Sequence, residues 1–298
     1  MKKAYPMDEG RTTTYKIIIL FAILSLFYLN TCFASGEIIY SRQTESYWQL
    51  WLMNTDGSND HQITSTPKDK RTPTVSMDGK KICYRSGNGE LFTIDINGNN
   101  EQRILTQFNQ MMDPSFSPIE DKLAFARISP RVSDTSQVWI ARPSGEEAQI
   151  LSQKAKLNYH PVFSPDGKKI LFIRSQGKGI HDLCLFDIKT RQESLLTDSQ
   201  SFNSWASFSK DGKTILFASN RENKDYDIYT MNAEKKKITR LTHEKGLDIE
   251  PVYADNEKKI IFVSNRSGQQ QIWSMTTEGK DIKQLTSENE SIEPAIIP

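Results

Sequence analysis

The sequence predicts an all-β protein, a six-bladed β-propeller with four-stranded blades. Three observations predict this fold. A block of related sequence recurs six times, the segments between the copies are short and apolar like strands, and no stretch has the periodicity of a helix. Units of about 40–45 residues, each with four strands, are typical of propellers.

The repeat is clearest in two adjacent copies. Residues 161–172 read PVFSPDGKKILF, and residues 206–217 read ASFSKDGKTILF. Further copies start at Pro73, Pro114 and Pro251, and a truncated copy starts at Pro294. Consecutive starts are 41, 47, 45, 45 and 43 residues apart. The six copies therefore describe one recurring structural unit.

Each unit is expected to contain four short strands. The first carries an aromatic residue such as Phe163, and a tight turn such as Asp166-Gly167 joins it to the second. The second strand is apolar on both faces, as at 170–172, so it needs cover on both sides. A third strand follows, and the short fourth strand ends in a hydroxyl residue in all six units. Blades in a ring supply the cover, because each blade lies against its neighbours.

The order of the strands predicts how the ring closes. The chain enters at the second strand of a unit, residues 37–42, and ends with a first strand, residues 293–297. One blade is therefore expected to combine one C-terminal strand with three N-terminal strands, which leaves no open sheet edge at the seam.

The first 34 residues differ from the rest and are predicted to be a cleaved signal peptide. Basic residues precede an apolar run of 13 residues, 17–29, and small residues follow at positions 34 and 35. Residues 35–298 then form the propeller, in the periplasm or secreted. Two alternatives stay open: a membrane anchor formed by residues 17–34, and lipid attachment at Cys32. A membrane is expected as a partner only in those two cases.

Composition narrows the range of partners. The whole chain has a net charge of +1, and residues 35–298 have a net charge of −1. Binding to phosphates needs a concentrated positive field, so no nucleic acid is expected. Cys83 and Cys184 lie within apolar strand patterns, which favours buried free thiols over a disulfide. The protein is expected to be a monomer.

The repeat resembles that of the TolB-like propellers. The resemblance rests on the 161–172 block, the DIYTMN run at 227–232 and the RLT run at 240–242, and it covers about residues 37–298. It implies a propeller whose mouth binds protein partners in the cell envelope, as in TolB of the periplasmic Tol–Pal system. TolB itself places a small α/β domain before its propeller. Here the predicted signal leads directly into a blade strand, so that domain is expected to be missing.

No catalytic residue is predicted. The sequence has no Gly-x-Ser-x-Gly elbow, no His-Glu-x-x-His helix and no glycine-rich phosphate loop before a helix. Of the four histidines, only His160 occupies a position expected to face inward. No cofactor is expected, although a channel-bound cation such as Ca²⁺ is an alternative.

The candidate site consists of the residue before each repeat start, because these six are expected to converge at the mouth of the central channel. They are Thr72, Asp113, His160, Trp205, Glu250 and Glu293. Trp205 suits a protein-binding hot spot. Converging carboxylates repel unless a cation or basic partner neutralises them, so any metal would be held by Asp113, His160, Glu250 and Glu293. Ordinary loop roles for all six remain open.

The sequence thus predicts an exported, non-enzymatic propeller that binds a protein or peptide partner at its funnel mouth, in cell-envelope processes as for TolB-like proteins. The alternative is a propeller enzyme, a lyase or hydrolase, with a metal or carboxylate site at the central channel.

Overall fold

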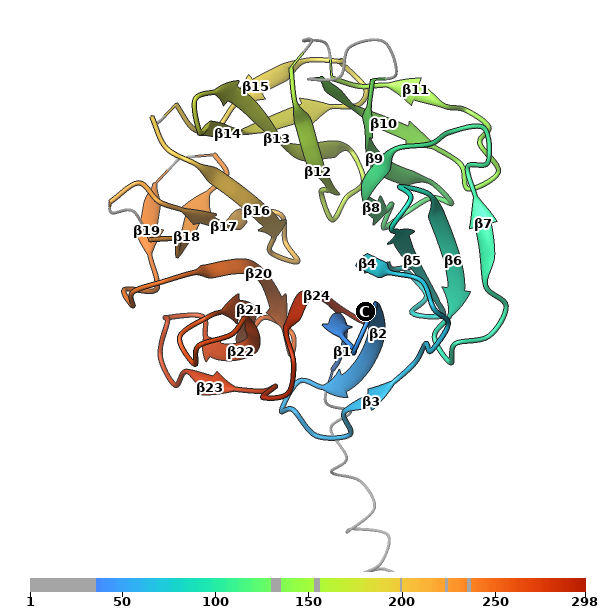
Figure 1. Ribbon diagram of the computed structural model, residues 1–298. Coiled ribbons are helices and arrows are strands. Elements are labelled where there is room, and N and C mark those ends of the chain that lie inside the picture. The colour runs from blue at the N-terminus through green and yellow to red at the C-terminus, as the bar shows by residue number, and fades with distance from the viewer. Residues whose placement is uncertain (1–35, 130–134, 153–155, 199, 223–224, 235–236) are drawn as a thin grey trace, which may run out of the picture. The chain divides into compact units, whose positions relative to one another are not determined.

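The computed structural model describes residues 36–129, 135–152, 156–198, 200–222, 225–234 and 237–298. The predicted signal peptide at 1–34, with Cys32, lies outside these ranges. Within them, 24 strands form six four-stranded sheets arranged as blades around a central channel (Figure 1). None of the described segments is a helix long and apolar enough to cross a membrane. The predicted six-bladed all-β fold is confirmed.

Every blade runs from an inner strand at the channel to a short outer strand, with antiparallel neighbours. The blade shared by both ends of the chain contains β24 (Ser291–Ile296), β1 (Glu37–Gln43), β2 (Trp48–Asn54) and β3 (His61–Gln62). The next contains β4 (Lys70–Val75), β5 (Lys81–Ser86), β6 (Leu91–Asp95) and β7 (Gln102–Ile104). The third contains β8 (Met111–Phe116), β9 (Leu123–Ile128), β10 (Ser136–Ala141) and β11 (Gln149–Ile150).

The remaining three blades repeat this order. The fourth contains β12 (Asn158–Phe163), β13 (Lys169–Gly177), β14 (Ile180–Asp187) and β15 (Glu193–Leu195). The fifth contains β16 (Asn203–Phe208), β17 (Thr214–Ser219), β18 (Asp227–Asn232) and β19 (Ile238–Arg240). The sixth contains β20 (Asp248–Ala254), β21 (Lys259–Ser264), β22 (Gln271–Thr276) and β23 (Lys283–Gln284).

The ring closes as the strand order predicts. β24 pairs antiparallel with β1, so that Ile296 lies opposite Ile38 and Ser291 lies opposite Arg42 (Figure 1). The Ile297 backbone N–H also donates to the Glu37 carbonyl at 3.0 Å. One C-terminal strand and three N-terminal strands therefore make one blade.

The core lies between blades rather than in one central cluster. Phe172 of β13 is fully buried and packs with Val138 and Ile140 of the preceding blade, while Phe217 of β17 packs with Leu171 in the same way. Cys184 and Cys83 are buried in two such clusters and are not joined by a disulfide, as predicted.

The hydroxyl at the end of the fourth strand ties the outer part of a blade together. It accepts a hydrogen bond from a backbone N–H near the start of the third strand. Leu50 N–H donates to Thr64 Oγ1 at 3.0 Å, and Ile272 N–H donates to Thr286 Oγ1 at 2.9 Å. Ser152, Thr197 and Thr242 accept the equivalent bond. Thr106 differs from the others because it is exposed.

Close contact between blades should make Gly279 intolerant of any side chain. Its φ is +76°, and a Cβ there would lie 2.4 Å from the Leu241 carbonyl oxygen of the adjacent blade. Gly179 is a matched control, because its φ is +77° and a Cβ would meet nothing within 4 Å. Overpacking costs about 1–3 kcal/mol, so Gly279→Ala should lose that much more unfolding free energy than Gly179→Ala in urea titrations. Equal losses would show that only backbone strain matters at Gly279.

Candidate functional site

The inner strands place the six predicted residues through a repeated backbone irregularity. Pairing with the second strand shifts register at this point, for example between Arg71 and Thr74 on β4 and between Tyr159 and Val162 on β12. All six predicted residues have a positive φ, between 49° and 58°. This conformation is uncommon for residues other than glycine, and such strain is characteristic of functional sites. A bulge also redirects a side chain, here toward the channel axis.

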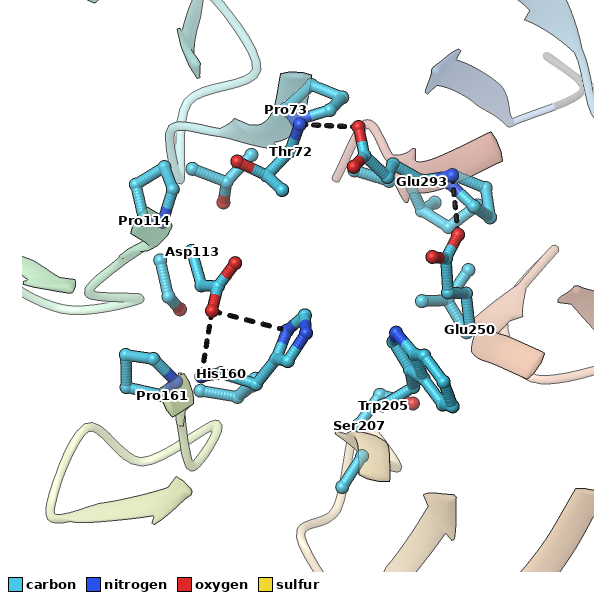
Figure 2. Close-up of a pocket in the computed structure, with 18 of the residues that line it drawn as sticks. Thr72, Pro73, Asp113, Pro114, His160, Pro161, Trp205, Ser207, Glu250 and Glu293 are labelled. Atoms are coloured by element: carbon cyan, nitrogen blue, oxygen red, sulfur yellow. Dashed lines mark hydrogen bonds and ion pairs between the residues drawn. The ribbon is translucent and has the colours of Figure 1, made fainter. Parts of the chain in front are cut away.

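The structure brings all six predicted residues together around one cavity. Figure 2 shows their side chains arranged in a ring, hereafter the channel ring: Thr72, Asp113, His160, Trp205, Glu250 and Glu293. The cavity has a volume of about 690 Å³. Beyond the ring it is lined by a layer of five prolines and Ala206, then by small residues such as Ser115 and Ser207, and by Phe163, Phe208 and Tyr253.

Hydrogen bonds link the ring carboxylates to the next blade. Glu250 Oε2 accepts the Glu293 backbone N–H at 2.6 Å, and Glu293 Oε2 accepts the Thr72 N–H at 2.6 Å (Figure 2). In the same way, Asp113 Oδ2 accepts the His160 N–H at 3.1 Å. Each of these carboxylates therefore satisfies a backbone donor that the positive φ of its neighbour turns toward the channel.

Arg71 is a cavity residue that the sequence prediction missed. Its guanidinium donates to both oxygens of Glu293, at 2.7 to 3.0 Å, and lies 4.3 Å from the Trp48 ring centroid. The bulge makes two consecutive residues line the channel, which simple strand alternation does not allow. A sequence signal was present, because the equivalent residue is uncharged in the other five blades: Met112, Tyr159, Ser204, Ile249 and Ile292.

Glu250 makes no ion pair with any of the described residues. Burial, followed by the negative charge of Glu293, raises the pKa of Glu250 to about 8. The Glu293 N–H and the more distant Arg71 act in the opposite direction but are weaker. Glu250 therefore retains a proton through most of the neutral range, and the channel carries less negative charge than its three acids suggest.

The acids do not gather around one point. Asp113 lies beside His160, with Oδ2 3.9 Å from Nδ1, and Glu250 lies beside Glu293 on another side of the channel (Figure 2). Across the ranges that the structure describes, no group of three or more His, Cys, Asp or Glu residues is arranged to hold a metal ion. Metal binding by Asp113, His160, Glu250 and Glu293 stays a prediction.

Trp205 is partly buried and fixed by other rings. Its ring centroid lies 5.6 Å from that of Phe202, 6.0 Å from that of Tyr226 and 6.4 Å from that of His160. Phe202 and Tyr226 are not channel-ring positions, so the sequence prediction missed them. A rigid aromatic side chain that keeps part of its surface open can bind a partner at little cost in conformational entropy.

Comparison with known proteins identifies the family. A family model described as the TolB beta propeller domain matches residues 85–225 and 222–298. The uncharacterized peptidase YuxL of Bacillus subtilis is 30% identical over 128 residues, covering 42% of this chain and 18% of the relative. The Tol-Pal system protein TolB of Francisella tularensis subsp. holarctica is 26% identical over 200 residues, covering 49% of this chain and 46% of the relative. The chain thus spans less than half of either relative.

A solved structure supports the same assignment at the level of the fold. The crystal structure of TolB from Acinetobacter baumannii superposes with a TM-score of 0.78 at 20% identity, covering 100% of this chain and 75% of the other. At this identity the likeness establishes the fold alone. Together with the family match over more than half of the sequence, it leads to one conclusion. The chain belongs to the TolB β-propeller domain family.

Proposed function

We propose that this protein is an exported, non-enzymatic propeller that binds a protein or peptide partner at the channel ring. The observation that carries the proposal is the ring itself. Each of the six blades places one residue with a positive φ at the same position, and all six of these residues line one cavity. The cavity of about 690 Å³ lies within the usual range of ligand sites, roughly 300–1,000 Å³.

The chemistry of the ring suits a peptide better than an apolar small molecule. Trp205 supplies an aromatic surface, while Asp113 and His160 supply hydrogen-bonding groups on the same wall. Interface hot spots combine aromatic anchors with polar groups in desolvated pockets in this way. Thr72, Glu250 and Glu293 complete the proposed binding ring.

The setting proposed for this interaction is the cell envelope. Relatives that match the chain are named as Tol-Pal system proteins, which supports a periplasmic location and envelope partners. Export by cleavage of a signal peptide at 1–34 is part of the proposal. Membrane attachment through residues 17–34 or a lipid on Cys32 is the alternative, and mass spectrometry of the mature N-terminus distinguishes the three cases. We further propose a monomer with no nucleic-acid partner.

Removal of the Trp205 side chain should weaken partner binding strongly. The experiment is capture from an envelope extract on immobilised protein, identification of the retained partner, and measurement of its Kd with purified components. Loss of a central aromatic anchor costs about 2 kcal/mol or more, so Trp205→Ala should raise Kd by roughly 30-fold. Tyr47→Ala is the control, because Tyr47 is an exposed aromatic residue that does not line the cavity.

The Tyr47→Ala control distinguishes a specific role of Trp205 from a general effect of removing an aromatic side chain. Tyr47→Ala should leave Kd within about twofold, since surface contacts outside an interface contribute little. If Trp205→Ala and the native protein bind the identified partner equally well, the channel ring is not the binding site.

A further inference from the structure

Arg85 departs from the repeat at a position that is buried and uncharged in every other blade. The residue follows the aromatic side chain of the second strand. Its five counterparts are all 0% exposed: Ser41, Ala126, Ile173, Ala218 and Val263. Arg85 on β5 is only partly buried. Because small or apolar residues suffice to pack this position five times, blade packing does not explain an arginine here.

The guanidinium of Arg85 also lacks a partner. Its Nε is buried without a hydrogen bond, and within the described residues Arg85 makes no ion pair and stacks on no ring. Arginines that serve the fold behave differently: Arg266 donates to both oxygens of Asp248 at 2.8 Å and lies over Phe262. A buried donor that is left without an acceptor destabilises a protein. An unpaired guanidinium in a cavity wall therefore indicates a ligand.

Arg85 borders open space, although its Nε is buried. It lines the channel cavity and also a smaller cavity of about 180 Å³ that includes Gly87, Gly89 and Met112. In the β4–β5 pairing Arg85 lies opposite Arg71, the residue that precedes Thr72 in the sequence. Thr72 Oγ1 is likewise buried without a hydrogen bond. One wall of the channel thus contains, on adjacent strands, an arginine Nε and a threonine hydroxyl that have no hydrogen-bond partner within the described residues.

The neighbouring charges leave this wall open to an anion. Arg71 is already paired with Glu293, so it neutralises that acid. Asp113 is directed at the His160 N–H and imidazole (Figure 2). Glu250 holds a proton through most of the neutral range, as described above. The planar fork of an arginine matches the two oxygens of a carboxylate, which is the common anion of an unmodified peptide.

We propose that Arg85, with the hydroxyl of Thr72, forms a carboxylate-binding site in the channel. It receives either an Asp or Glu side chain or the C-terminal carboxylate of the peptide partner. The inference rests on the proposed function, since it names the chemistry by which the partner is recognised. It adds a residue that is not part of the channel ring and predicts an acidic group in the partner's inserted segment.

The test uses the full chain and three small probes. N-acetyl-alanyl-alanine carries only a terminal carboxylate, N-acetyl-aspartyl-alaninamide carries only a side-chain carboxylate, and N-acetyl-alanyl-alaninamide carries neither. Each is titrated into ¹⁵N-labelled protein, and the Thr72 amide and the arginine Nε–H signals are followed by NMR. The Arg85 signal is identified by its disappearance in Arg85→Gln.

At least one of the two carboxylate probes should shift the Thr72 and Arg85 signals in a saturable way, and the neutral probe should not. A hydrogen bond to a charged group contributes about 1.5–3 kcal/mol, so Arg85→Gln should weaken that binding at least tenfold. Lys210→Gln is the matched control, because it removes an exposed positive charge from the lining of the same cavity. It should change the affinity less than threefold.

Two results would overturn the proposal. The first is that neither carboxylate probe binds, or that both proteins, native and Arg85→Gln, bind the probes equally well. The other is a lower urea midpoint for Arg85→Met, because that would show that Arg85 stabilises the fold. Removal of a charge that has no partner should leave the midpoint unchanged or raise it. Neither result depends on the Trp205 experiment. If Trp205→Ala does not weaken partner binding, the channel ring is rejected as the binding site of the partner. The carboxylate titration still tests Arg85 independently.

Discussion

Deletion of residues 293–298 should lower the unfolding free energy by about 5 kcal/mol or more, a large share of the roughly 5–15 kcal/mol that stabilises a domain. The deletion removes most of β24, including the pairing of Ala295 and Ile296 with β1. It leaves an open edge on β1 and removes Glu293, the ion-pair partner of Arg71. Breaking a partly buried ion pair from one side and exposing a strand edge are both costly.

The measurement is a urea titration of proteins that end at residue 292 and at residue 296. The longer protein is the control, because it keeps all of β24 and loses only Ile297 and Pro298. It should lose about 1–3 kcal/mol, from the hydrogen bond of Ile297 to Glu37 and from the partly buried Ile297 side chain. Identical midpoints for the two proteins would contradict closure by β24.

Glu250→Gln should abolish a pH dependence of stability that we expect the native protein to have between pH 5 and pH 8. The folded protein raises the pKa of Glu250 to about 8, whereas the unfolded chain has the ordinary value near 4.5. The folded state therefore holds a proton that the unfolded state releases. This contribution to stability is complete below the unfolded pKa and is lost as pH rises through the folded pKa, at up to ~1.4 kcal/mol per pH unit.

Urea titrations at pH 5, 6.5 and 8 check this expectation. Native protein should lose stability steadily across the series, while Glu250→Gln, which is neutral at every pH and of the same shape, should stay level. Glu288→Gln serves as the control, because Glu288 is an exposed acid outside the cavity, and it should follow the native protein. A Glu250→Gln series parallel to the native one would place the titrating group elsewhere.

The fold could be predicted because its determinants are local and repeated. Asp166-Gly167 fixes a turn between neighbouring strands, and Phe172 marks a strand that is covered on both sides. Such signals need no knowledge of distant parts of the chain. The Asp-Gly turn recurs in three units and the aromatic strand position in all six, which reinforces the interpretation. The channel ring was predictable for the same reason, since one position before each repeat start must recur at one place in every blade.

The contacts within the site could not be predicted in this way. Arg71 and Glu293 are 222 residues apart, so their pairing depends on ring closure rather than on neighbouring sequence. The positive φ at Thr72 lets consecutive residues face the channel, which breaks the alternation expected of a strand. Arg85 left a sequence signal, a charge in an uncharged column, but its lack of a partner is visible only when the blades are assembled.

The position of the seam couples ring closure to ligand binding. Glu293 belongs to β24, the one inner strand that no peptide segment joins to its neighbour β1 within the blade, and it also forms part of the cavity wall. A ligand that touches Glu293 finds its site only while β24 is docked. By mass action its binding free energy is added to that of the docked state. A bound ligand would then stabilise the closed ring. Without a ligand, the ring would open first at the blade of β24, β1, β2 and β3.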